Sequence, residues 1–326
     1  MLINLQSNEN PFLPPKNVME AAKKGLKNIN RYSELEYLNE LKQLLADYND
    51  ISPQRITLSP GSDLLLRNII NTFSKNRKII TINPSFFSIF HQALKFANKL
   101  IKIQLVPQNF ALKPELILYE LDDPTLIIID NPNNPTGAIL LDENLIENIL
   151  QSPNALLLID EAYFEFSKQT FAGLIEQYPN LAILRTMDKA FSLAGLRLGY
   201  LLAGDFFKNK FLDFPKFLPT PTLFAGIEAL KNPEYVFENV EKIIAEREKV
   251  KEKLHELNIE VFPSKGNFLL IKSNAPDFEQ KMVGKGILIR SLSEEWLSDF
   301  YRVSIGLPKE NDAFLLAISL PHKMKG

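Results

Sequence analysis

The sequence predicts an α/β fold, with a large domain built on a mostly parallel, seven-stranded sheet and a small C-terminal α/β domain. Between residues 56 and 203, short apolar runs alternate with segments of helical periodicity, which is the pattern of strands joined by crossover helices. The apolar runs contain few polar residues, so we expect a sheet covered on both faces. The 326 residues, 45% of them hydrophobic, are enough to bury the cores of two domains.

The first half of the chain supplies the elements of the large domain. The first 17 residues are rich in Asn and Pro and predict an extended arm. Helical patterns follow at residues 18–26 and 35–48, and a turn of small residues at 59–63 begins an apolar helix that runs to Phe73. Strands are expected at 56–58, 78–82, 101–105, 125–130, 155–160, 181–186 and 198–203, and further helices at 88–97 and 144–150.

A long helical pattern from Glu234 to Leu257 is interpreted as the connector to the small domain. A Pro-rich loop, Pro215 to Pro221, precedes it. Strand-like runs at 259–262, 268–272, 287–291 and 301–306 predict an antiparallel sheet. The expected division is an N-terminal arm that packs with the small domain (1–30), a large domain (31–233) and a small domain (234–326).

Composition excludes several classes of function. A net charge of −2 and a pI near 6.1 argue against nucleic acid or an anionic membrane as the main partner. The chain has no signal-like start and no apolar run long enough to span a membrane, so we expect a cytoplasmic protein. Without cysteine it has no disulfide and no thiolate site. The three histidines, His91, His255 and His322, lack ligand spacing, so no metal site is expected.

Polar residues stand at the ends of three predicted strands. Asp160 closes one apolar run, the sequence NPNNPTG (131–137) follows another, and Lys189 lies three residues after a third. Because the carboxyl ends of parallel strands meet at one edge of the sheet, these side chains should lie together. An acid, an amide and a lysine at one edge are what a pyridoxal phosphate site requires. Each alone would more commonly be a surface charge or a loop cap, so the prediction depends on the combination.

The turn at residues 59–63 is a candidate anion site. Small residues before a helix leave free N–H groups under the positive end of the helix dipole. Capping of the helix by Ser62 or Asp63 is the alternative interpretation.

These motifs, taken together, make the chain resemble the fold-type I pyridoxal-phosphate aminotransferases, and among them the histidinol-phosphate aminotransferase group. The resemblance runs nearly end to end, and its motifs occur in the family's order. They are NENP (8–11), INRY (29–32), the GSD turn (61–63), NPNNPTG (131–137), LIDEAYFEF (158–166), LRTMDKAFSLAGLRLGY (184–200), GNFLLI (266–271) and YRVSIGLPKEND (301–312).

The resemblance implies roles for residues around the cofactor ring. Lys189 would bind the cofactor covalently and act as the base, and Asp160 would pair with the pyridine nitrogen. Asn134 and Tyr163 would hydrogen-bond the ring's phenolic oxygen. Phe86 would stack on the ring, where many relatives have Tyr.

The resemblance also implies a phosphate site and a substrate site. The phosphate would rest on the turn Gly61, Ser62 and Asp63, with Thr186 and Arg197 adding a hydroxyl group and a charge. Tyr32 would reach the phosphate in a neighbouring subunit, so a homodimer is expected. Arg302 would hold the substrate carboxylate, and Asn10 is a second candidate for substrate binding.

The implied activity is transfer of an amino group between an amino acid and a 2-oxo acid or a related carbonyl compound. Two alternatives remain open at this point. One is an amino-acid decarboxylase resembling the threonine-phosphate decarboxylases, and the other is a non-catalytic binding protein that kept the fold.

Asp188 departs from the family pattern, in which a Ser usually precedes the lysine and contributes to phosphate binding. Two unit charges about 5 Å apart cost about 3 kcal/mol at an effective dielectric near 20. We therefore expect Asp188 to point away from the phosphate or to pair with a cation, for which Arg197 and Arg185 are the candidates.

Overall fold

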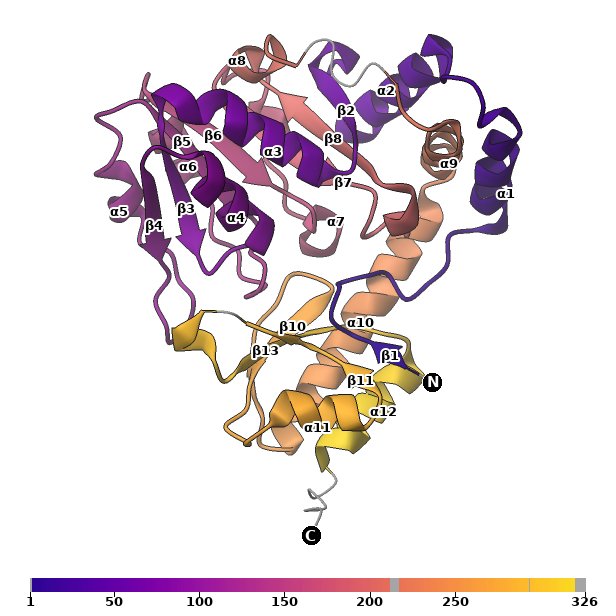
Figure 1. The fold of residues 1–326 in the computed structure, drawn as a ribbon, viewed down its shortest axis with the longest axis vertical. Coiled ribbons are helices and arrows are strands. Elements are labelled where there is room, and N and C mark those ends of the chain that lie inside the picture. Colours follow the sequence, from indigo (N-terminus) through magenta and orange to yellow (C-terminus); the bar gives the residue numbers. More distant parts are fainter. Residues whose placement is uncertain (1, 212–216, 293, 320–326) are drawn as a thin grey trace.

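The computed structural model describes residues 2–211, 217–292 and 294–319, and it contains the predicted large sheet (Figure 1). Its strand order is β2-β8-β7-β6-β5-β3-β4. Strand β8 runs antiparallel to both of its neighbours, and the remaining pairs are parallel. The strands are β2 (Ile56–Pro60), β3 (Lys78–Asn83), β4 (Leu100–Gln104), β5 (Thr125–Asp130), β6 (Ala155–Asp160), β7 (Leu181–Thr186) and β8 (Leu198–Ala203).

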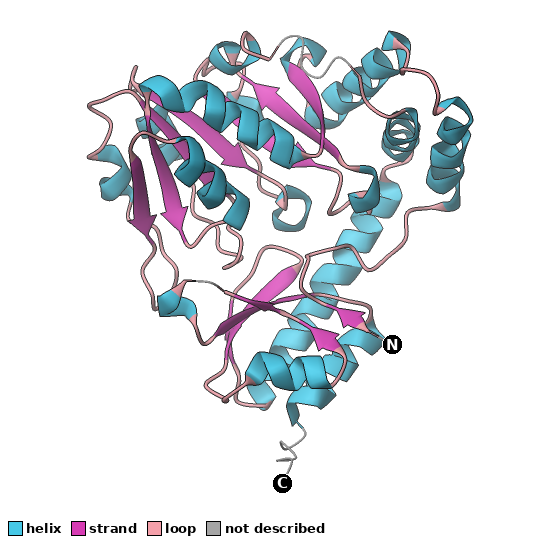
Figure 2. Cartoon of the chain, in the orientation of Figure 1, coloured by secondary structure: helices cyan, strands magenta, loops and turns pink. Residues whose placement is uncertain are grey.

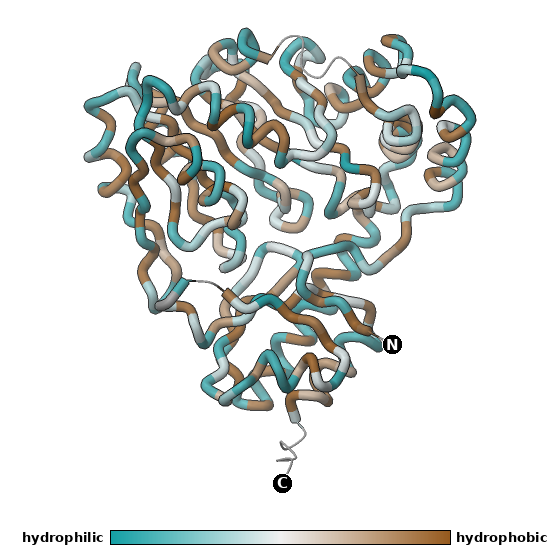
Figure 3. The backbone as a smooth tube through the Cα atoms, in the orientation of Figure 1, coloured by the Kyte–Doolittle hydropathy of each residue, from teal (hydrophilic) through white to brown (hydrophobic). Residues whose placement is uncertain are grey.

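Helices cover both faces of this sheet, which explains why its strands read as unbroken apolar runs (Figure 2). Successive residues of β5, such as Ile127 and Ile128, point into different hydrophobic cores on the two faces of the sheet. Figure 3 shows these strands coloured as hydrophobic. One face packs on α3 (Ser62–Phe73), α4 (Phe87–Phe96) and α8 (Asp205–Lys208), and the other on α2 (Leu35–Asn49), α6 (Glu143–Leu150) and α9 (Thr220–Lys231). The short helices are α5 (Pro114–Leu118) and α7 (Phe164–Ser167).

Helix α10 (Glu234–Glu256) runs from the large domain into the small one, as Figure 1 shows. The small sheet has the order β12-β13-β10-β9 and is antiparallel throughout, which confirms the prediction. Its strands are β9 (Glu260–Phe262), β10 (Phe268–Lys272), β12 (Arg290–Ser291) and β13 (Phe300–Ser304), and its helices are α11 (Phe278–Gly284) and α12 (Pro308–Ser319).

The N-terminal segment contacts both domains. Strand β1 (Ile3–Asn4) pairs in parallel with β11 (Ile287–Leu288) of the small domain. Helix α1 (Lys16–Gly25) instead packs on α9, so closely that a Cβ at Gly25 would lie 2.6 Å from the Cα of Pro221. The expectation that residues 1–30 pack as a whole with the small domain is therefore wrong for α1, because this helix buries its apolar face on the large domain.

The sequence prediction lacks helices α5, α7, α8, α9, α11 and α12. Helix α9 begins inside the segment interpreted as a Pro-rich loop (Pro215 to Pro221). Residues 215 and 216 of that segment lie outside the described part of the chain, as does His322. Pro221 is tolerated because it stands in the first turn of α9. Most residues of α9 are buried, so the helix lacks the polar face that amphipathic periodicity requires.

Candidate active site

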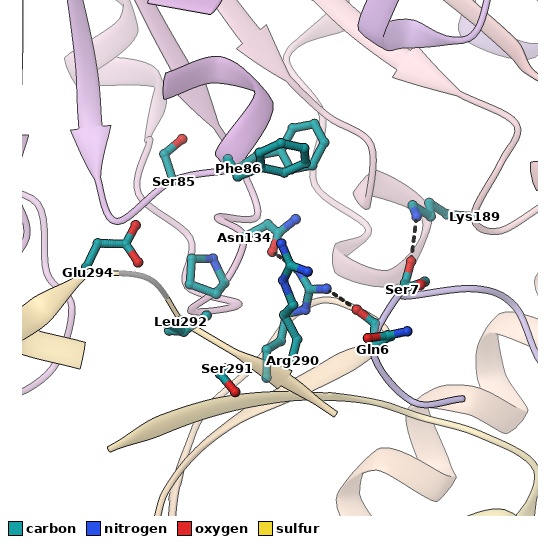
Figure 4. Close-up of a pocket in the computed structure, with 13 residues that line it drawn as sticks. Gln6, Ser7, Ser85, Phe86, Asn134, Lys189, Arg290, Ser291, Leu292 and Glu294 are labelled. Carbon is teal, nitrogen blue, oxygen red and sulfur yellow. Dashed lines mark hydrogen bonds between the residues drawn. The ribbon is translucent and has the colours of Figure 1, made fainter. Parts of the chain in front are cut away.

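Two adjoining cavities of about 320 and 120 Å³ lie beyond the carboxyl ends of β5, β6 and β7. This is where open α/β sheets place their ligands. Figure 4 shows Phe86 on one side of the larger cavity and Gln6 and Ser7 of the N-terminal arm on another. The residues that line both cavities are Ser7, Phe86, Asn134, Lys189 and Arg302.

Lys189 is held by the N-terminal arm. Its Nζ donates to the carbonyl oxygen of Ser7 at 3.2 Å (Figure 4), and Asn10 Nδ2 donates to the carbonyl oxygens of Lys189 and Ala190 at 3.2 and 3.1 Å. Burial lowers the pKa of the Lys189 amine to about 8, which leaves an appreciable fraction of the amine neutral near neutral pH. Asn10 is absent from the lining of both cavities, and its predicted contact with substrate stays a prediction.

Asp160 ends β6 and lines the smaller cavity. Among the described residues its carboxylate accepts one hydrogen bond, from the backbone N–H of Ala162 at 3.1 Å. Burial raises the pKa of Asp160 to about 8, and the nearby Asp130 acts in the same direction. A buried carboxylate with so few donors is stabilised by a cationic N–H group beside it.

Asp130 ends the neighbouring strand β5 and is satisfied by the protein itself. Its carboxylate accepts from Ser85 Oγ at 2.8 Å and Asn133 Nδ2 at 3.0 Å. It also accepts from the backbone N–H groups of Phe86 at 3.1 Å and Asn134 at 2.7 Å. Asp130 therefore fixes the two loops that carry Phe86 and Asn134 to the cavity. No role was predicted for Asp130 from the sequence.

Tyr163 is surrounded by amide donors. Its hydroxyl oxygen accepts from Asn8 Nδ2 at 2.9 Å and from Asn134 Nδ2 at 3.4 Å. Burial raises the pKa of Tyr163 to about 12, so the phenol keeps its proton. Because both contacts supply protons to the oxygen, the hydroxyl proton is free to be donated elsewhere in the cavity.

Asn8 was not assigned by sequence reasoning, although it belongs to the NENP motif. It is buried, has a φ of 51°, and its backbone N–H donates to Ser304 Oγ at 2.8 Å. A positive φ is uncommon in a residue with a side chain and is frequent at functional sites.

The predicted anion site lies at the start of α3. Gly61 has a φ of 82° and is followed by Ser62, the first residue of the helix. A Cβ at Gly61 would lie 2.6 Å from Arg197 Nη2, so this glycine lets the guanidinium approach the helix start. Thr186 and Asp63 complete the wall of the cavity.

Asp188 also lines this end of the smaller cavity. It forms an ion pair with Arg197, so the expected pairing with a cation is confirmed. Arg185 instead binds the Glu161 carboxylate, with Nη2 2.7 Å from Oε2.

Two arginines face the larger cavity from the small domain. Arg302 Nη1 donates to Asn134 Oδ1 at 2.5 Å, and Nη2 donates to the Gln6 carbonyl oxygen at 2.5 Å. Its Nε is buried and lacks a partner among the described residues. Arg290, which the sequence analysis missed, lines the same cavity and is the cross-strand partner of Arg302.

Tyr32 lies away from both cavities. Its side chain is 81% exposed and its ring stacks on Phe217, with 4.7 Å between the centroids. Within one chain Tyr32 is therefore not part of the site.

The groups around the smaller cavity fit pyridoxal phosphate. The cavity has an amine of lowered pKa, a buried carboxylate with one donor, and amide and phenol groups beside an aromatic ring. Its other end has helix N–H groups and a guanidinium, the usual donors for a phosphate. Lys189, Asp160 and Arg197 are the residues that would hold the aldehyde, ring nitrogen and phosphate of this cofactor.

Within the described ranges, no cluster of three or more His, Cys, Asp or Glu side chains is arranged to hold a metal ion. No described helix is both long and apolar enough to cross a bilayer.

Comparison with known proteins agrees with this geometry. Residues 1–318 match the family model of class I and II aminotransferases. The histidinol-phosphate aminotransferase of Sulfurisphaera tokodaii is 38% identical over 320 residues, covering 96% of this chain and 88% of the relative. That of Clostridium acetobutylicum has a crystal structure with a TM-score of 0.88 and 27% identity, covering 97% of this chain and 98% of that one.

The histidinol-phosphate aminotransferase of Sinorhizobium meliloti, solved in complex with pyridoxal-5′-phosphate, has the same fold, with a TM-score of 0.88 and 24% identity over 98% of this chain and 90% of that one. The family match extends over almost the whole sequence and includes both domains around the cavities. The chain therefore belongs to the class I and II aminotransferase family and is a pyridoxal-phosphate-dependent aminotransferase.

Proposed function

We propose that this aminotransferase exchanges the amino group of histidinol phosphate with a 2-oxo acid. The observation that carries the proposal is the pair Arg290 and Arg302 in the larger cavity. They are directly opposite each other on β12 and β13, an arrangement that is destabilising for like charges. A doubly charged phosphate ester between them would offset the repulsion better than the single charge of a carboxylate.

The surroundings of Arg302 support an anion at this place. Burial lowers the pKa of its guanidinium, and the positive charge of Arg290 acts in the same direction. Its unpartnered Nε is a buried donor, and such a group is costly unless it is hydrogen-bonded. The protein supplies two neutral acceptors, on Asn134 and Gln6, which leaves the charge for a ligand.

The residues of the site have separate tasks in this reaction. When bound, pyridoxal phosphate supplies an electron sink for negative charge at the substrate carbon that bears nitrogen. The Lys189 amine would hold the cofactor's aldehyde carbon and, once freed, would serve as the base for the proton on the substrate carbon. Asp160 would stabilise the positive charge of the ring nitrogen, and the Tyr163 hydroxyl would donate a hydrogen bond to the phenolic oxygen.

Activity on paired substrates tests the proposal. We expect kcat/KM for histidinol phosphate to exceed that for histidinol, which lacks the phosphate, by about a hundredfold or more. Arg290→Gln should remove most of this preference, whereas Arg67→Gln on the exposed face of α3 should preserve it. Lys189→Ala serves as the inactive reference. Equal activity on both substrates, or carbon dioxide release from amino acids in place of amine transfer, would contradict the proposal.

The proposal includes a cytoplasmic homodimer in which Tyr32 completes the partner's phosphate site. Support comes from the absence of cysteine, which suits a reducing compartment, and from the exposure of the Tyr32 ring. Mixed dimers of Tyr32→Phe and Lys189→Ala subunits should place both lesions in one site and leave the other intact. A fully active monomer in sedimentation would exclude this arrangement.

A further inference from the structure

Asp188 occupies an unusual position for a carboxylate. It is 5% exposed, and it lines the cavity at the end where Ser62 and Arg197 would bind a phosphate. Its backbone N–H donates to Thr186 Oγ1 at 3.1 Å, which fixes the start of the side chain. One carboxylate oxygen binds Arg197, and the other, Oδ1, is buried without a hydrogen-bond partner of normal geometry among the described residues.

The charges at this end do not suit a phosphate if every group is ionised. The Arg197 guanidinium contacts two carboxylates, Asp188 and, at 3.4 Å, Asp63 on α3. Among the described residues, Lys189 is a second cation near Asp188, but its amine would be used by the covalent bond to the cofactor. A phosphate would therefore meet one guanidinium already shared by two acids, and the buried acid would repel it.

We propose that Asp188 binds the cofactor's phosphate as a neutral carboxylic acid, with a proton on its unpartnered oxygen that is donated to a phosphate oxygen. The acid thus does the work of a serine hydroxyl, since a protonated carboxyl group has one O–H donor. The proton comes from solvent, so cofactor binding takes up one proton at Asp188. The proposal rests on the cofactor of the family and is independent of the substrate proposed above.

The surroundings of Asp188 favour the proton. Burial raises the pKa of this carboxyl group. Arg197, Lys189, the Thr186 hydroxyl and the Leu198 backbone N–H act in the opposite direction, and they do not cancel the rise. A bound phosphate dianion raises the pKa further, because it stabilises the neutral acid over the carboxylate. Asp63 carries the same charge, but its side chain is 48% exposed, so water screens that charge.

Binding of 4-deoxypyridoxine 5′-phosphate, which lacks the aldehyde and cannot react with Lys189, tests the proposal by calorimetry. Between pH 7 and 9 the phosphate is already a dianion, because its second pKa is about 6. We expect the Kd of the wild type to rise with pH more steeply than that of Asp188→Asn, by up to about tenfold per pH unit. Titrations in buffers of different ionisation enthalpy should show that the wild type takes up to about one more proton than Asp188→Asn when it binds the probe.

Asp63→Asn is the matched control, because it removes the same charge from Arg197 and should keep the steep wild-type dependence. For a version of the probe that lacks the phosphate, the pH dependence of the Kd should be the same in wild type and Asp188→Asn. Equal pH slopes of the Kd for wild type and Asp188→Asn would overturn the proposal. Loss of the slope in Asp63→Asn would also overturn it, because the pH dependence would then come from the net charge around Arg197 and not from a proton on Asp188. If Asp188→Asn fails to fold, Asp188→Ser provides the same comparison. Failure of every variant to bind the probe would instead contradict the cofactor itself.

Discussion

Asp130 and Asp160 stand side by side at the ends of β5 and β6, paired in register, and their surroundings differ sharply. Asp130 accepts four hydrogen bonds from the loops around it. Asp160 accepts one within the described chain. Both are buried. The difference shows that the unsatisfied hydrogen-bonding capacity of a buried acid, more than its position, distinguishes an acid that binds a ligand from one that maintains the fold.

The largest effect is expected from Asp160→Asn. The amide cannot hold the positive charge of a ring nitrogen, so kcat/KM should fall about a thousandfold or more, which corresponds to about 4 kcal/mol. Steady-state kinetics with saturating cofactor measure the loss. If Asp160→Asn kept more than a tenth of the wild-type activity, the assignment of Asp160 as the ligand-binding acid of the two would be contradicted.

Asp130→Asn should act mainly on stability. The amide presents an NH₂ group to donors that now share one carboxylate, and we expect a loss of about 3 kcal/mol in the free energy of unfolding. Urea denaturation of the cofactor-free protein measures it, and kcat per folded molecule should change by less than about tenfold. A greater loss of activity than Asp160→Asn causes, with unchanged stability, would reverse the assignment of the two acids.

A third test uses the pH dependence of stability without cofactor. The folded-state pKa of Asp160 is raised to about 8, from about 3.9 in an unfolded chain, so the folded state binds the extra proton. Its contribution to stability is complete below pH 4 and is lost as the pH rises towards 8. The melting temperature of Asp160→Asn should therefore exceed that of the wild type at pH 8 by about 2 °C or more. A wild type at least as stable as the variant at pH 8 would contradict the raised pKa.

The smallest effect is expected at Asp188, a second acid with an unpartnered oxygen. Since Asp188 pairs with Arg197 and is neutral when phosphate binds, Asp188→Ser should tighten cofactor binding at pH 7 by less than about tenfold, or 1.4 kcal/mol. Titration of the cofactor-free protein gives the ratio. A gain of a hundredfold would mean that an ionised Asp188 faces the phosphate.

Much of this molecule follows from its sequence. The positions along the chain of the strands of the large sheet are predictable, because buried parallel strands are continuous apolar runs. The positions of Asp160 at the end of β6 and of Lys189 on the loop after β7 follow from the rule that strand ends meet at one edge. The antiparallel small sheet was also correctly predicted.

The remaining features depend on contacts between distant segments, which local patterns do not encode. Asn8 reaches Tyr163 across 155 positions of sequence. Arg290 acquires its place through cross-strand pairing with Arg302. The sequence places Asp130 at a strand end in the same way as Asp160, but only the fold shows that the hydrogen bonds of Asp130 are satisfied.

The position of the N-terminal arm has a consequence for biosynthesis. Ser7 and Asn8 contact Lys189 and Tyr163, and the Leu5 carbonyl oxygen accepts from the N–H of Ser304 at 2.8 Å. The arm is translated about 300 residues before its partners in β13. At 5–20 residues per second this interval is roughly 15–60 s. On the ribosome the large sheet can therefore fold, with Lys189 at its edge, before β13 has been synthesised. The arm can be held over Lys189 only after the small domain has folded.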